Sequence, residues 1–446
     1  MNTKLLLLPT VALGMAAFLL SPSKDASAFS KLGGSLDVSQ RDFRVFNNFA
    51  DDASNNNVRG SAEFPGFLAA EQAIWKGSAE WNSSARGGDI TQAGIGDGQS
   101  NFEAFFAGNT TSIGSTDDNI VSALSTCNGG VIAFTEIPIA DGWRIRFCDD
   151  KTFSDGPGPI PGHLYDLQGI MTHEYGHALG LGHSTVGNAT MYPVVSTGQV
   201  IQRSINFDDI AGLQCLYGSL SGSKPMISGV SVSGGSITIT GSGFDTAATN
   251  EVWFTHRNVT ASGGDPRVRV FNVSSTGGGT SITVAIPGDA GAGEVAVKTS
   301  GSLSSDLSNT FPTDLGEPFF GGSVFSNGSG SNPPCFMSTS LPQLGQTLNM
   351  QVDASAHPGG AGFSGVLIYA GSALIPTVSG ELLVDLSSPQ YGFLGGSSSG
   401  GIDLYSSTPV PDPSFLGATA TAQGFTFSLS VTVLCNAENL TLGAAP

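Results

Sequence analysis

The chain has 446 residues, of which only 12% are charged, and its 36 acidic residues against 17 Lys and Arg give a formal net charge of −19. This balance disfavours nucleic acid and anionic membrane surfaces as partners, and its simplest role is to keep a surface rich in Gly and Ser soluble. The length exceeds what one hydrophobic core supports and predicts about three domains.

The first 28 residues are typical of a secretory signal peptide. Lys4 precedes a largely apolar run over residues 5–20, and the small residues that end at Ala28 form a cleavage signal. A membrane anchor is the alternative, but this run is short for a bilayer and is interrupted by Pro9. We therefore expect secretion, extracellular or periplasmic, with cleavage after Ala28, and no later segment predicts a membrane span.

The next segment predicts a strand near Phe43 and an amphipathic helix that begins near Pro65. Its apolar residues at helical spacing should face the core; they are Phe67, Ala70, Ile74 and Trp81. Two strand-like runs follow at residues 131–137 and 143–147, before a helix that begins near Asp166.

Residues 173–183, HEYGHALGLGH, carry the strongest functional signal. His173 and His177 are four residues apart, so on a helix they lie on one face and can bind one metal ion. Glu174 lies beside the metal without being a ligand, where it can act as general base toward a zinc-activated water. Gly180 lets the chain leave the helix, so that His183 returns as third ligand and the fourth position stays open.

Two other interpretations of this motif are a helix whose histidines satisfy hydrogen bonds in the core and a structural zinc site. The chain has only six His, so three at these offsets are a rare coincidence. A structural site normally closes with a fourth Cys or His, and none follows nearby. The motif therefore predicts one catalytic zinc ion.

The residues after the motif extend the pattern. Ser184 follows the third histidine directly, ATMYP contains Met191 and Tyr192, and FDDIAGLQCLYG at residues 207–218 predicts a helix. With the zinc motif, these segments resemble the metzincin metalloproteases, and within them the matrixins. The resemblance covers roughly residues 40–218 and implies an α+β, zincin-like catalytic domain with a twisted mixed sheet and an active-site helix.

The resemblance also implies roles for single residues. Met191 is expected in the Met-turn, as an apolar floor beneath the metal, and Tyr192 is expected to shape the site. One carboxylate of Asp208 and Asp209 should tie the closing helix to the Met-turn. In matrixins an edge strand pairs with extended substrate, and either strand-like run is a candidate.

The sequence departs from the matrixin pattern in ways that limit what can be transferred. His163 is the only histidine upstream of His173, so we expect no second, structural zinc. The stretch before the first strand is short for a propeptide with a cysteine switch. Val195 replaces the usual tyrosine of the S1′ wall, and Gly169 should leave that pocket unplugged. An acidic loop, with Asp149, Asp150 and Asp155, is a candidate calcium site, although such loops are more often only solvated.

After a linker at residues 219–224, residues 225–312 alternate at period two and predict an all-β sandwich. The alternating apolar pairs include Ile237 and Ile239, Val268 and Val270, Ile282 and Val284, and Val295 and Val297. ITITGSGF and SITVAIP within this segment resemble the IPT/TIG immunoglobulin-like module, which implies a spacer or binding role.

Residues 313–446 alternate again and predict a second sandwich. Leu348, Met350 and Val352 share one face, and a long strand is expected to run from Phe425 through Leu429 to Val433, with Cys435 continuing its buried side. PVPDPSFLGATATAQG, at residues 409–424, resembles part of a terminal β-sandwich of secreted bacterial proteins.

Five cysteines in an exported chain predict disulfides with one thiol left over. The preferred pairs are Cys127 with Cys148 and Cys335 with Cys435, because each pair stays inside one predicted domain. Cys215 would then be a free, buried thiol on the closing helix.

The sequence thus favours a secreted zinc endopeptidase of the bacterial matrixin type, residues 29–218, that cleaves extracellular proteins and is followed by two β-sandwich modules. Glu174 is the expected catalytic base, and His173, His177 and His183 are the expected ligands of the zinc. Two alternatives are an inactive adhesion or binding protein that uses its β-sandwiches, and a metal-dependent hydrolase acting on another bond. The sequence does not indicate an oligomeric state.

Overall fold

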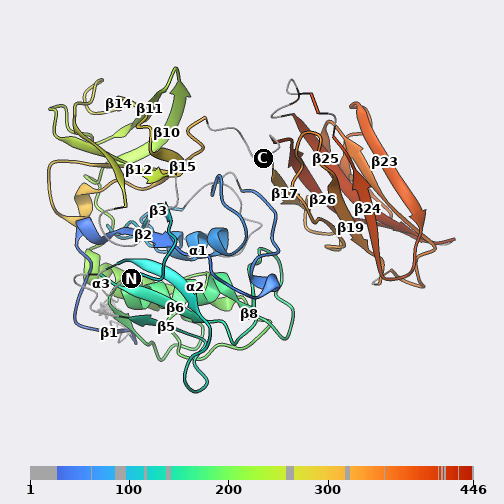
Figure 1. Cartoon of the computed structure of the whole chain (residues 1–446), viewed down its shortest axis with the longest axis horizontal. Coiled ribbons are helices and arrows are strands. Elements are labelled where there is room, and N and C mark those ends of the chain that lie inside the picture. The colour runs from blue at the N-terminus through green and yellow to red at the C-terminus, as the bar shows by residue number, and fades with distance from the viewer. Residues whose placement is uncertain are drawn as a thin grey trace, which may run out of the picture.

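The computed structural model describes residues 28–61, 63–85, 97–114, 118–136, 142–257, 266–316, 322–355, 357–409, 411–412, 415, 418–429 and 431–443. They form three bodies: a mixed α+β unit, a β-rich unit packed against it, and a second β-rich unit beside both (Figure 1). Of the predicted signal peptide, residues 1–28, all but Ala28 lie outside the described residues. Among the described residues, no helix is long and apolar enough to cross a membrane.

The first unit is built on a five-stranded mixed sheet of order β3-β2-β4-β6-β5. The four strands from β3 to β6 in this order are parallel, and only β5 at the edge is antiparallel to its neighbour. The strands are β2 (Asp42–Val45), β3 (Phe105–Asn109), β4 (Ile120–Leu124), β5 (Ala133–Glu136) and β6 (Arg144–Cys148).

Three helices complete this unit: α1 (Ala69–Ala79), α2 (Leu167–Ala178) and α3 (Phe207–Tyr217). The expected start of α1 near Pro65 is wrong. Gly66 has a φ of +84°, a conformation outside the right-handed helix, so the helix begins only at Ala69. By contrast, the start of α2 is confirmed, because the Asp166 side chain caps the helix by accepting from the backbone N–H of Gly169.

The helices α1 and α2 pack together, and one core joins them to the sheet. Its aromatic centre is formed by Tyr175 of α2, whose ring lies 5.8 Å from that of Phe43 and 5.3 Å from that of Trp143. Ala70 and Ile74 of α1 are fully buried, as the helical spacing predicts. This packing fixes α2, and with it the zinc motif, against the sheet.

Short elements join the ends of this unit. The pairs are β1 (Ser30–Lys31) with β9 (Leu181–Gly182), and β7 (Phe153–Ser154) with β8 (Tyr165–Asp166). The 3-10 turns are η1 (Val38–Gln40), η2 (Asp52–Ser54) and η3 (Ile201–Arg203). Before β1, the backbone N–H groups of Ala28 and Phe29 both donate to Asp208 Oδ1 on α3, at 2.8 and 3.2 Å. The two residues that flank the predicted cleavage site are therefore both held against α3.

The second unit has two sheets around one core. One sheet contains β10 (Met226–Ser233), β11 (Ser236–Ser242) and β14 (Ser281–Ala285), and the other contains β13 (Val268–Val273), β12 (Asn250–His256), β15 (Ala290–Lys298) and β16 (Phe311–Thr313). A 3-10 turn, η4 (Ser304–Asp306), precedes β16. The alternating residues Ile237, Ile239, Val295 and Val297 are fully buried, which agrees with the period-two pattern.

The third unit is also β-rich. Its five-stranded sheet contains β17 (Gly322–Ser326), β26 (Thr432–Thr441), β25 (Thr419–Phe427), β20 (Phe363–Tyr369) and β23 (Gln390–Ser397). A three-stranded sheet contains β18 (Phe336–Ser338), β19 (Leu348–Asp353) and β24 (Ile402–Ser407), and a hairpin contains β21 (Ser372–Thr377) and β22 (Gly380–Val384).

The long strand expected over residues 425–433 is wrong. β25 ends at Phe427 and β26 begins at Thr432, because the chain turns back where the backbone N–H of Ser428 donates to the carbonyl of Val431. Leu429 lies in this turn and is fully exposed. Both strands alternate between apolar and polar residues, so the sequence pattern shows no break at the turn between them. Part of the 409–424 segment lies outside the described residues.

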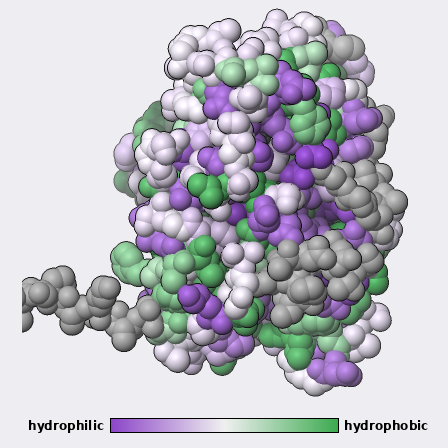
Figure 2. Space-filling model, turned by 90° about the vertical axis from the view of Figure 1, so that its left-hand side faces the viewer, coloured by the Kyte–Doolittle hydropathy of each residue, from purple (hydrophilic) through white to green (hydrophobic). Residues whose placement is uncertain are grey.

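The first two units share a buried interface. Glu294 of β15 is 1% exposed and accepts hydrogen bonds from the indole N–H of Trp75 (2.9 Å) and the backbone N–H of Phe106 (2.7 Å). The Thr255 hydroxyl donates to the Phe106 carbonyl (2.6 Å), and an apolar cluster around Trp253 fills the contact. Seen from the left of Figure 1, the two units form a continuous surface with mixed hydrophilic and hydrophobic residues (Figure 2).

The third unit meets the first at Arg59. Its guanidinium lies 3.1 Å from Glu438 Oε1 and 5.5 Å from the centre of the Phe325 ring. Glu438 is fully buried, and its other oxygen accepts from Ser338. This polar contact differs in kind from the apolar interface of the second unit.

Both expected disulfides are present, Cys127–Cys148 and Cys335–Cys435, and Cys215 is free. The expectation that Cys215 is buried is wrong, because its thiol is exposed. The buried side chains of Leu213 and Tyr217 mark the side of α3 that faces the core. Cys215 lies midway between them in the sequence and therefore on the opposite side of the helix, which faces solvent.

Candidate metal centre

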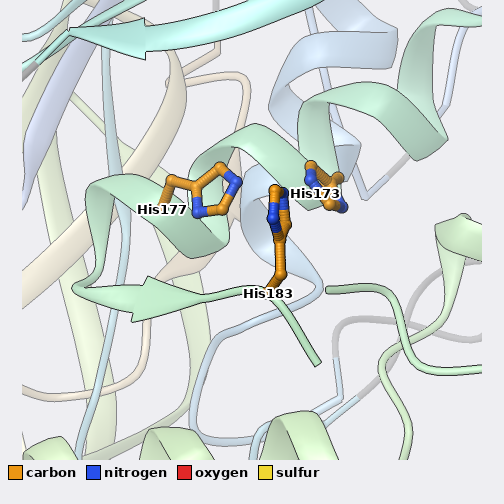
Figure 3. A group of neighbouring side chains, drawn as sticks. All are labelled: His173, His177 and His183. Carbon is orange, nitrogen blue, oxygen red and sulfur yellow. The ribbon is translucent and has the colours of Figure 1, made fainter. Parts of the chain in front are cut away.

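Two of the predicted metal ligands project from α2, and the third follows β9. Gly180 has a φ of +104°, which ends the helical path and lets the chain reverse so that His183 faces His173 and His177. The ring centres lie 4.9 to 5.4 Å apart, and one nitrogen from each ring lies within 4.8 Å of the others. Figure 3 shows the three imidazoles pointing toward one another from these two elements.

The second nitrogen of two rings is held by backbone carbonyls. His173 Nδ1 lies 2.6 Å from the Thr190 carbonyl oxygen, and His177 Nδ1 lies 2.8 Å from that of Leu181. A carbonyl can only accept, so both Nδ1 atoms carry the proton and both Nε2 lone pairs are free for a metal. Burial and the neighbouring histidines lower the pKa of His173 to about 3, which keeps this ring neutral. The donor set therefore fits a zinc ion.

Glu174, the predicted general base, follows His173 on α2 and lines the cleft beside the histidines. Its side chain is buried, and burial raises the pKa of its carboxyl to about 7, against the lowering effect of a hydrogen bond from Thr135. The Thr135 hydroxyl lies 2.9 Å from Glu174 Oε2 and 2.8 Å from the Glu174 carbonyl oxygen. Sequence analysis did not single out Thr135, because only the fold brings β5 over α2.

Met191 lies beneath the histidine helix, as the resemblance implies. A Cβ at Gly176 would lie only 2.3 Å from Met191 Sδ, so this close packing requires glycine in the middle of α2. Asp209 accepts from the backbone N–H groups of Thr190 (2.8 Å) and Met191 (3.1 Å). This carboxylate ties α3 to the turn, as predicted, and its partner Asp208 instead accepts from the Ser184 hydroxyl. Gly176 is visible in the HEYGH motif, but the motif alone does not show that this position packs closely against Met191.

A cleft of about 460 Å³ runs along β5 and over the histidines. It is lined by backbone and side chains of residues 130–135, by Tyr192 and Pro193, and by Val195 and Gln202. Of the two strand-like runs, the first therefore borders the site; Ile137 at its end lies outside the described residues. Gly169, which was expected to leave the S1′ pocket unplugged, is not among the residues that line this cleft. It lies in the first turn of α2 against Asp166, and Ile170 takes the cleft position.

The three acidic residues of the candidate calcium loop have separate partners. Asp149 accepts from the backbone N–H of Ala50 (2.8 Å), and Asp150 pairs with Lys151 at 2.5 Å. Asp155 accepts from a backbone N–H, and burial raises its pKa to about 7. The upstream His163 is exposed and is not grouped with the three histidines.

Comparison with known proteins agrees with this geometry. Residues 109–218 match the matrixin family. Human matrilysin is 40% identical over 83 residues, which cover 19% of this chain and 30% of matrilysin. The hatching enzyme of Paracentrotus lividus is 41% identical over 95 residues, covering 21% of this chain and 15% of that enzyme. Metalloendoproteinase 4-MMP of Arabidopsis thaliana is 36% identical over 80 residues, 18% of this chain and 20% of that protein.

The segment that matches the matrixin family contains β4, β5, β6, α2 and α3, with the whole histidine cluster. The chain spans less than a third of the length of each of these three relatives. The second and third units lie outside the matched segment.

Proposed function

We propose that this protein is a secreted zinc-dependent endopeptidase that hydrolyses peptide bonds of extracellular proteins. The observation that carries the proposal is the convergence of His173, His177 and His183 beside a buried Glu174, within a matrixin domain. The cleft lies beside an edge of β5 with which no described strand pairs, and this supports a polypeptide substrate, because an extended chain can pair with such an edge.

In this proposal the three histidines would hold one zinc ion, His173 and His177 with the nitrogen that their backbone hydrogen bonds leave free. When bound, zinc lowers the pKa of a coordinated water and polarises the scissile carbonyl. Glu174 accepts the proton of the attacking water on a carboxylate oxygen and delivers it to the departing amine. The hydrogen bonds from the Nδ1 atoms of His173 and His177 hold the two rings in the tautomer that this role needs. Met191 and Tyr192 shape the site and take no part in proton transfer.

We propose the boundaries expected from the sequence: catalytic residues 29–218, linker 219–224, an IPT/TIG-like unit at 225–312 and a terminal module at 313–446. Three separate cores support three units, and the core of the second unit reaches Leu315, a few residues past the proposed boundary. Export with cleavage after Ala28 belongs to the same proposal. It is supported by the hydrogen bond that the backbone N–H of Phe29, the first residue after that site, donates to Asp208 Oδ1 at 3.2 Å.

Calcium is a secondary part of the proposal, at Asp149 and Asp155. Each carboxylate keeps one buried oxygen without a hydrogen-bond partner among the described residues, and the charge of Asp51 adds to the burial that raises the pKa of both. A divalent cation would compensate these carboxylates. Calcium should then raise the melting temperature of the wild type, and this rise should vanish in Asp155→Asn; equal rises in both would contradict the assignment.

The direct test is cleavage of casein by the full chain with and without a zinc chelator. The endopeptidase proposal predicts cleavage that the chelator abolishes and added zinc restores. Cleavage that is indifferent to the chelator would contradict the zinc mechanism. An inactive binding protein would not cleave at all, and a hydrolase of another bond would respond to the chelator only with a different substrate.

A further inference from the structure

We propose that Thr135 is a positioning residue that couples substrate pairing on β5 to the orientation of the Glu174 carboxylate. This inference rests on the proposed peptidase function and deepens it. Thr135 belongs to the antiparallel edge strand of the sheet, whereas Glu174 belongs to the helix below it. Their side-chain contact joins the substrate-binding element to the catalytic element.

The side chain of Thr135 faces α2. Its register partner on β6 is Ile145, which is fully buried in the core between sheet and helices. The hydroxyl lies 2.9 Å from Glu174 Oε2, and this is the side-chain hydrogen bond that the buried carboxylate receives from the strand. The Glu174 carbonyl, 2.8 Å away, already has a helical N–H partner four residues along. The single hydroxyl proton is therefore best used by the carboxylate.

The backbone of Thr135 points the other way. The N–H of Cys148 donates to the carbonyl of Ile132, which makes these two residues a hydrogen-bonded pair of the antiparallel ladder. Hydrogen-bonded and non-hydrogen-bonded pairs alternate, so Phe134 pairs inward with Arg146, whereas Ala133 and Thr135 direct their N–H and C=O groups outward. No described strand pairs with that outer side of β5.

Thr135 thus offers its backbone to an extended substrate and its hydroxyl to the general base. When a substrate strand pairs with Ala133 and Thr135, it fixes β5 in position. A fixed β5 holds the hydroxyl, and through it the carboxylate, in one orientation toward the reacting bond. Precise orientation of a general base raises the chemical rate without adding ground-state binding, so the effect belongs in kcat.

The test compares Thr135→Val with Thr135→Ser in the full chain. Valine keeps the shape and strand propensity but removes the hydroxyl, whereas serine keeps the hydroxyl. With a quenched-fluorescent peptide built around a mapped casein cleavage site, we expect kcat of the valine variant to fall about ten-fold, from the loss of one hydrogen bond to a charged group. KM and zinc content should stay at the wild-type values, and the serine variant should lie within about two-fold of the wild type.

A matched control is Thr238→Val, which removes a hydroxyl from an exposed strand of the second unit. It should leave kcat unchanged. Substrate length sharpens the test: the wild type should gain kcat when the peptide is extended to pair with β5, and the valine variant should lose this gain.

Equal kcat values in the valine variant and the wild type would overturn the inference, as would a loss that serine does not rescue. Both outcomes differ from failure of the proposed function itself, in which the zinc-loaded wild type would not cleave the peptide.

Discussion

The two edge strands of the sheet in the first unit, β5 and β3, differ in whether another part of the protein covers them. At one edge, none of the described strands pairs with the outer side of β5, which borders the cleft over the histidine cluster. At the other, the second unit covers β3, and Phe106 gives its N–H to Glu294 and receives a hydrogen bond from Thr255. An uncovered strand edge can pair with another chain. The comparison shows that the fold closes the edge away from the site and leaves free the edge that a substrate would use.

A buried glutamate contacts each edge strand of this sheet: Glu294 contacts β3, and Glu174 contacts β5. Glu294 accepts hydrogen bonds from Trp75 and Phe106, so its two oxygens are both used in the structure. Glu174 receives one side-chain hydrogen bond, from Thr135, and burial raises the pKa of its carboxyl. Satisfied carboxylates stabilise, whereas poorly satisfied ones are costly and occur at functional sites. The two glutamates should therefore respond to mutation in opposite ways.

The largest effect is expected at the open edge. Glu174→Ala should lower kcat by about 10²- to 10⁴-fold, because the general base is lost. Zinc content and melting temperature should match the wild type, because among the described residues Thr135 is the one donor to this carboxylate. Casein cleavage, metal analysis and thermal unfolding measure the three quantities. Near wild-type cleavage by this variant would contradict the assigned role.

At the closed edge, Glu294→Ala should destabilise the fold by about 3 kcal/mol, because it leaves two buried N–H donors without an acceptor. The kcat of the folded protein should not change. Urea unfolding measures the loss, and Glu294→Gln, which keeps one acceptor oxygen, should lose about half as much. If Glu294→Ala unfolds at the same urea concentration as the wild type, the second unit does not contribute to the stability of the first.

Proline substitutions on β5 can separate the backbone N–H groups that face outward from those that pair with β6. Ala133→Pro removes an outward N–H, so KM for an extended peptide should rise about ten-fold while stability changes little. The matched variant Phe134→Pro removes an inward N–H of the ladder and should instead destabilise the fold by about 3 kcal/mol. Steady-state kinetics and thermal unfolding of both variants test the assignment. The reverse result would mean that the strand register is wrong.

The smallest effect is expected between the first and third units. Arg59→Met removes the contact with Glu438 but keeps the apolar stem. Cleavage of a short peptide should not change, and small-angle scattering should show a wider range of distances between the third unit and the rest. An unchanged scattering profile would show that other contacts hold the third unit.

Local sequence predicted much of the site. The histidines at 173, 177 and 183 and the capping residue Asp166 act through neighbours a few residues away, so their placement is visible in the sequence. The alternating residues of the second unit also predicted their own burial, because each strand is buried on one side.

Contacts across long sequence separations could not be predicted in this way. Thr135 meets Glu174 only because β5 lies over α2, and Glu294 meets Trp75 from another unit. The turn at residues 428–431 escaped prediction because an alternating pattern does not show where a strand reverses. Cys215 was misjudged because its exposure depends on which side of α3 faces the core.

The most direct test of the central claim is the zinc content of the purified full chain, measured by native mass spectrometry for the wild type and for His177→Ala. The account predicts one tightly bound zinc ion in the wild type, removed together with casein cleavage by a chelator. It predicts that His177→Ala, lacking one of the three imidazoles, loses both the ion and the activity. A wild type that binds no zinc, or a His177→Ala variant that binds it equally well, would contradict the claim.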